Sequence, residues 1–171
     1  MNRADEDDYR EFVKARLEPW RRMAYLLCRD WHAADDLVAI TIGKLYRHWR
    51  KARAAENVDA YARGVLTHAW LDEMRRPWRR EDATAAPPDT ATVEVGIDGR
   101  VADREALHGL LLSLGARQRA VVVLRYYCDL SVEQTAEILG ISTGTVKSQA
   151  ARGLETLRSL APDHTADGSG R

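Results

Sequence analysis

The chain has 171 residues, of which 45% are hydrophobic, and its formal net charge at pH 7 is zero. This length suits one domain of ordinary size or two small ones with packed cores. Because no apolar run approaches the roughly 18 residues of a membrane span, and the charged N-terminus has no signal-peptide core, we expect a cytoplasmic protein with no membrane partner.

Residues 1–79 are expected to form a bundle of three helices. The helices are predicted over residues 7–29, 33–51 and 58–76, since apolar residues recur in each at helical spacing. In the second, for example, Leu37, Thr41, Leu45 and Trp49 repeat every four residues. Pro77 ends the third helix, because the residue before a proline disfavours helical geometry.

Charge is distributed unevenly along the chain despite the zero total. Residues 41–80 contain ten Lys and Arg against four acidic residues, whereas residues 81–110 contain seven acidic residues against two Arg. The basic block offers a surface to an acidic polymer. Within the acidic block, residues 80–102 include Pro87 and Pro88 and show no sustained period, which predicts a flexible linker.

Residues 103–161 are expected to form a second helical domain, followed by a polar, disordered tail over residues 162–171. The β-branched run AVVVLRYY, residues 120–127, has the composition of a strand. A helical pattern precedes it, however, and Ser131 follows it as an N-cap. The fold class we predict is therefore all-α, with two small helical domains joined by the linker.

The segment SVEQTAEILGISTGTVKSQAARGLETL, residues 131–157, predicts a helix-turn-helix. Its helices are expected over residues 132–139 and 143–160. Ala136 is small where the helices cross, Gly140 permits a left-handed turn, and Val146 packs back into the crossing. This spacing is typical of DNA-binding motifs, although an ordinary helical hairpin with a solvated outer face is the alternative.

The two cysteines and five histidines do not indicate a metal or cofactor site. Cys28 and Cys128 lie far apart, and no His stands at ligand spacing from either. We expect two reduced, buried thiols, with no metal and no cofactor.

Three segments together resemble a bacterial RNA polymerase sigma factor of the extracytoplasmic-function (ECF) type, closest to the actinobacterial subgroup often called the SigE family. They are AYLLCRDWHAADDLV (residues 24–38), DAYARGVLTHAWLDEMRRPWRRE (residues 59–81) and RQRAVVVLRYYCDLSVEQTAEILGISTGTVKSQAARGLETLR (residues 117–158). The resemblance implies a non-enzymatic factor that directs promoter-specific initiation. Residues 1–79 would be sigma region 2, which binds core polymerase and the −10 element, and residues 103–161 region 4, which binds the −35 element.

The resemblance also implies where the polymerase binds. The β′ clamp would contact Asp35, Asp36, Leu37, Val38, Thr41, Lys44, Leu45 and Tyr46. The two acids have an alternative role at the start of a helix, where they complement its dipole. Many family members place a Gln–acid pair after the Leu-Val, and this chain has Ala39 and Ile40 instead, which leaves its polymerase affinity open.

Contacts to the −10 element would come from a basic and aromatic set: Trp49, Arg50, Lys51, Arg53, Asn57, Arg63, His68, Trp70, Arg75, Arg76, Arg79 and Arg80. Stacking on an aromatic ring contributes about 1–3 kcal/mol per base, and cations hold the phosphates. Asn57 is the expected base-edge reader. Core packing is the alternative for Trp49 and Trp70, and a solvated face is the alternative for the arginines.

Contacts to the −35 element would come from the second helix of the motif and from two arginines before it: Ser142, Thr143, Thr145, Lys147, Ser148, Arg152, Arg117 and Arg119. Hydroxyls of this kind reach base edges, and the basic residues reach phosphates.

Two other classes of protein were weighed. A helix-turn-helix regulator would need a receiver or ligand domain, and residues 1–80 lack its strand–helix alternation. An enzyme would need a catalytic set, but Asp72 and Glu73 are adjacent and point apart on a helix. Regulation would come from an anti-sigma partner or, as a hypothesis, from the acidic linker (Asp82, Asp89, Glu94, Asp98) folding over the third helix.

Overall fold

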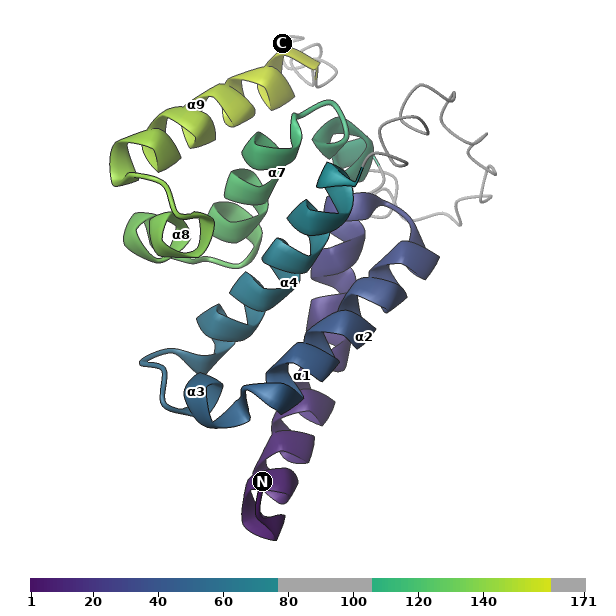
Figure 1. Ribbon diagram of the computed structural model, residues 1–171. Coiled ribbons are helices and arrows are strands. Elements are labelled where there is room, and N and C mark those ends of the chain that lie inside the picture. The colour runs from purple at the N-terminus through teal and green to yellow at the C-terminus, as the bar shows by residue number, and fades with distance from the viewer. Residues whose placement is uncertain (77–105, 161–171) are drawn as a thin grey trace, which may run out of the picture.

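A computed structural model describes residues 1–76 and 106–160, and every regular element in these two ranges is a helix (Figure 1). The first range contains α1 (Arg3–Cys28), α2 (Trp31–Arg47), α3 (Trp49–Arg53) and α4 (Val58–Arg75). The second contains a helical segment at residues 106–111, then α7 (Ala116–Val122), the π-helix η1 (Val123–Tyr127), α8 (Val132–Leu139) and α9 (Thr143–Leu160). The all-α prediction is confirmed, while the expected linker and tail lie outside the described residues.

The first domain is a bundle in which α1 packs against α2 and α4. Its largest fully buried side chains come from all three helices: Trp20, Met23, Leu27, Leu45, Leu66 and Trp70. Each helix begins at a side-chain cap, because Asn2, Asp30 and Asn57 accept hydrogen bonds from backbone N–H groups of the following turn. The three helices therefore start within four residues of the positions predicted from the sequence.

The second predicted helix is not continuous, which corrects the expected span of residues 33–51. The backbone N–H of His48 donates to the carbonyls of both Lys44 and Leu45 at 3.2 Å, and α3 then begins at Trp49. The break turns the indole of Trp49 into the core. There its ring centroid lies 5.5 Å from that of Tyr9 and 5.2 Å from that of Phe12.

The β-branched run in the second domain is helical, as the flanking pattern predicted. It forms α7 and then η1, where the backbone N–H of Cys128 donates to the carbonyl of Val123 at 2.9 Å. This wider turn ends the helix before the helix-turn-helix.

The helix-turn-helix has the geometry predicted for it. Ser131 and Gln134 form a reciprocal capping box at the start of α8. Gly140 ends α8 with a φ of 65°, in the left-handed region. Val146 is fully buried and packs with Ala136 at the crossing of the two helices.

The two domains touch each other in this structure, and α4 lies beside α8 and α7 (Figure 1). One apolar cluster runs without interruption from Trp20 and Leu27 of the first domain to Leu111, Leu114 and Val122 of the second. Among the helices of residues 1–76 and 106–160, none is long and apolar enough to cross a membrane.

Candidate nucleic-acid interface

The outer face of α9 carries the residues predicted to read duplex DNA. Ser142, Thr143, Thr145, Lys147, Ser148 and Arg152 are all exposed. Ser142 caps the helix, since its Oγ accepts from the Thr145 N–H at 3.1 Å and lies 2.8 Å from the Thr145 Oγ1. The turn of helix that would meet a base edge is thus rich in hydroxyls, with cations on either side of it.

A shallow groove beside this face contains residues that the sequence analysis missed. Arg125 and Tyr126 of η1 line it together with Lys147 and Arg158 of α9. Tyr126 and Tyr127 are about half exposed. The signal available in the sequence was the RYY that follows a fully apolar run, where a helix changes from buried to exposed.

Arg117 and Arg119 have different environments although both were predicted as phosphate ligands. Arg117 is exposed, as that role requires. Arg119 is only 8% exposed, and its guanidinium donates to the carbonyls of Leu111, Leu27, Leu112 and Leu114 at 2.7–3.2 Å. Burial lowers the pKa of Arg119 from its ordinary value. The prediction of a phosphate ligand is contradicted for Arg119, because every nitrogen of its guanidinium bonds a carbonyl inside the protein.

The cations predicted to contact the −10 element lie along α3 and α4. Arg50, Lys51, Arg53, His68, Arg75 and Arg76 are exposed. Arg53 is held by two carboxylates of α1, at 2.6 Å from the Asp5 Oδ1 and 3.3 Å from the Asp8 Oδ2. Arg79 and Arg80 lie outside the described residues. The described cations therefore form a basic surface that is fixed at one end by the acidic start of α1.

Trp49 and Trp70 do not belong to this surface. They are 4% and 2% exposed, and both pack in the core of the first domain. The alternative of core packing is therefore the correct one for both rings in this structure. A base cannot stack on either indole unless the core opens.

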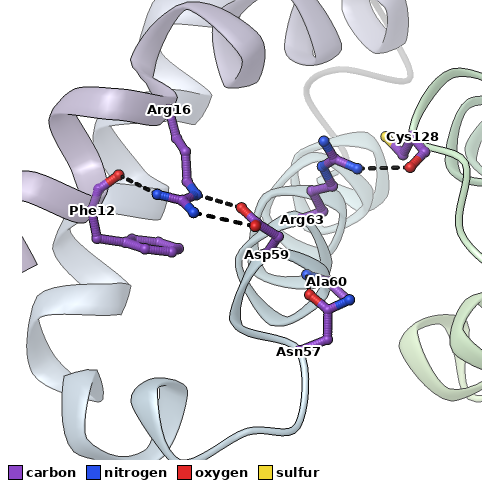
Figure 2. A network of polar contacts seen from close by, with 7 residues as sticks. All are labelled: Phe12, Arg16, Asn57, Asp59, Ala60, Arg63 and Cys128. Atoms are coloured by element: carbon purple, nitrogen blue, oxygen red, sulfur yellow. Dashed lines mark hydrogen bonds and ion pairs between the residues drawn. The ribbon is translucent and has the colours of Figure 1, made fainter.

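Asn57, Arg63 and His68 lie where α4 meets the second domain. The Asn57 side chain accepts from the Ala60 N–H at 2.9 Å, and Arg63 donates to the carbonyl of Cys128 at 2.8 Å (Figure 2). Asn57 and His68 line a groove of about 870 Å³ between α4 and α8. At the start of α4, Asp59 accepts two hydrogen bonds from Arg16 of α1, which fixes this end of the helix (Figure 2).

The predicted polymerase surface on α2 divides into exposed and buried residues. Asp35, Asp36 and Tyr46 are exposed and Lys44 is partly exposed. The hydrogen bond from Arg21 to Asp35, 2.6 Å from Nε to Oδ1, lowers the pKa of that carboxyl. The buried members belong to the core and contradict their prediction as contacts: Leu37, Val38, Thr41 and Leu45. They hold the helix in place and cannot touch a partner.

The exposed side of α2 includes the two residues that depart from the family pattern. Ala39 is exposed and Ile40 is 37% exposed. Both line a groove of about 400 Å³ between α2 and the end of α4, together with Asp36, Met74 and Arg76. This groove is more apolar than the sequence analysis expected for a polymerase contact.

Comparison with known proteins places both domains in one family. Residues 12–80 match the model of sigma-70 region 2, and residues 104–157 match that of sigma-70 region 4. The RNA polymerase sigma-E factor of Streptomyces coelicolor is 34% identical over 155 residues, which cover 88% of this chain and 84% of that protein. The ECF sigma factor SigW of Bacillus subtilis is 25% identical and covers 95% of this chain and 94% of its own length.

A solved structure shares the fold. The sigma factor RpoE of Bartonella quintana, crystallised with the anti-sigma factor NepR, superposes with a TM-score of 0.70 over 90% of this chain and 96% of that chain, at 24% sequence identity. The chain belongs to the ECF sigma factors of RNA polymerase, with sigma-70 regions 2 and 4. It is a non-catalytic initiation factor that directs promoter recognition through these two regions.

Proposed function

We propose that the exposed face of α9 binds the −35 element and that the basic surface of α3 and α4 captures the opened −10 strand. The domain limits would be residues 1–79 for region 2 and 103–161 for region 4. One observation carries the proposal: the helix-turn-helix leaves only hydroxyls, small residues and cations on the outer side of α9. Phosphate and base-edge contacts in the major groove need this chemistry.

The polymerase would bind the exposed stripe of α2, and its β′ clamp is the partner we infer. Asp35 and Asp36 would meet basic groups of the clamp, and Ile40 would add apolar contact where relatives carry charge. The cell compartment would be the cytoplasm, where the polymerase acts. An anti-sigma factor is a further candidate partner, because the Bartonella quintana sigma factor is bound to one.

Transcription from genomic DNA fragments by core polymerase with this chain tests the proposal, with the 5′ ends of the transcripts mapped by sequencing. A shared −10 and −35 pattern upstream of the starts is the expected result. Absence of any start that depends on the chain would overturn the proposed function.

The assignment of α9 has its own test in duplex binding. Lys147→Ala should weaken binding to the mapped −35 duplex and lower the salt slope of log K by about 1, because one phosphate contact is lost. Lys14→Ala, on the exposed side of α1, is the matched control and should change neither quantity. Unchanged binding by Lys147→Ala, Ser148→Ala and Arg152→Ala would exclude this face.

A further inference from the structure

The contact between the two domains is built around one buried arginine. The Arg119 Nη1 donates to the carbonyl of Leu27 at 2.7 Å, at the end of α1, and its other nitrogens donate to Leu111, Leu112 and Leu114 in its own domain. The last carbonyls of a helix have no partner within that helix and carry partial negative charge. Arg119 therefore caps one chain end from each domain simultaneously.

A second set of contacts covers α4 directly. Arg63 donates to the carbonyl of Cys128, just after η1, at 2.8 Å. At Gly64 the backbone of α4 comes so close to α8 that an added Cβ would lie 3.3 Å from the Ile138 Cγ1. No strand of nucleic acid fits between two helices at this separation.

The groove next to this contact has the wrong charge for DNA. Asn57 and His68 line it from α4, but so do Glu56, Glu133 and Glu137, the last two from α8. Carboxylates at such short range repel a phosphate backbone. The second domain therefore blocks this part of α4 by shape and by charge.

The DNA-reading face of α9 is not involved in the domain contact. Lys147, Ser148 and Arg152 are exposed, and α9 lies on the side of the second domain away from α4 (Figure 1). The two predicted DNA surfaces thus differ in accessibility within one and the same conformation.

We propose that the free chain is held closed by binding of its own region 4 to the −10 face of α4, and that polymerase must part the two domains before a strand can bind there. The inference rests on the proposed role of α4. A closed chain would bind the −35 duplex but not the opened −10 strand. Such a device keeps a free sigma factor from capturing single-stranded DNA without polymerase.

A disulfide between Gly64→Cys and Ile138→Cys tests the closed state. Since the Cγ1 of Ile138 is bonded to its Cβ, a Cβ at residue 64 would lie within about 4.8 Å of that Cβ, close to the 3.5–4.5 Å of natural disulfides. The bond should form in the free double variant on mild oxidation. Peptide mapping distinguishes it from bonds to Cys28 or Cys128, and each single variant is a matched control.

The oxidised double variant should keep its affinity for the −35 duplex within about 3-fold, yet lose promoter opening by at least about 10-fold, since the competent state is no longer populated. Reduction should restore opening. Failure of the bond to form, or full promoter opening by the oxidised chain, would overturn the inference. If the reduced variant and the parent chain both failed to bind polymerase, the proposed function itself would be wrong.

Discussion

At the scale of single residues, Arg119 shows what a charge pattern in a sequence conceals. Arg117 and Arg119 look equivalent in a list of basic residues near a DNA-binding motif, yet one faces water and the other is buried. The spacing held a signal, since Arg119 stands four residues before Val123, on the same inward face of the helix. A buried arginine needs acceptors, and these come from helix ends that sequence reasoning does not bring together.

Arg119→Met should lower the free energy of unfolding by about 2–4 kcal/mol, because hydrogen bonds to a charged group contribute about 1.5–3 kcal/mol each and some carbonyls regain water. Arg117→Met, at an exposed position of the same helix, should stay within about 0.5 kcal/mol. Urea unfolding followed by circular dichroism measures both values. Equal effects of the two substitutions would contradict the role assigned to Arg119.

Burial raises the pKa of the Cys128 thiol to about 11, from an ordinary value of 9.0. Between these values the unfolded thiol loses its proton while the folded one keeps it, so stability should fall as pH rises from 9 to 11 and be unaffected below 9. Cys128→Ala should lack this component of the fall. Denaturant titrations of both chains at pH 8 and pH 10.5 give the comparison, and identical pH dependence would contradict the assignment.

At the scale of elements, local chemistry decided what the sequence could predict. The helix-turn-helix was predicted to the residue, because its capping box at Ser131 and its left-handed Gly140 act within a few residues of chain. The break at His48 was missed, because it depends on the indole of Trp49 packing against Tyr9 and Phe12, about forty residues away. Exposure along α2 was mispredicted for a related reason, since the family motif includes core residues such as Leu37 and Leu45.

Gly153 is a glycine whose importance only the packing reveals. It lies in α9 where an added Cβ would come within 2.7 Å of the Val122 Cγ2 of α7. Gly153→Ala should destabilise the chain by about 1–3 kcal/mol through overpacking, although alanine favours the helix itself by about 1 kcal/mol. Thermal unfolding measures the net effect.

Two further variants decide whether the contact with Val122 is the cause. Adding Val122→Ala to Gly153→Ala should recover part of the loss, since the crowded methyl group is removed. Gly144→Ala in the same helix, where the nearest atom is 3.9 Å away, should cost nothing. Lack of any rescue would assign the effect to another cause.

At the scale of the molecule, two helical domains in the right order could be predicted, but their contact could not. Arg63 and Cys128 are 65 residues apart, and Arg119 and Leu27 are 92 apart. No periodicity or motif links such pairs in one sequence. The acidic-linker hypothesis lies outside the described residues, which instead show α8 and the end of η1 covering part of α4.

Gly64→Leu should push the domains apart, because the side chain would enter the space of Ile138. In small-angle X-ray scattering its radius of gyration should exceed that of the parent chain by at least about 2 Å, against about 16 Å for a compact chain of this length. Gly43→Leu, with no atom within 4 Å of an added Cβ, is the matched control. A parent chain as expanded as the Gly64→Leu variant would argue against closure.

The most direct test is the distance between the two domains in solution, measured by double electron–electron resonance. Spin labels at the exposed positions Glu11 and Glu155, in a chain with Cys28 and Cys128 replaced by alanine, report α1 against α9. A single short, narrow distance is expected for the free chain, with a longer one appearing when core polymerase is added. A broad, long distribution in the free chain, or an unchanged short distance in a polymerase complex that opens promoters, would contradict the account.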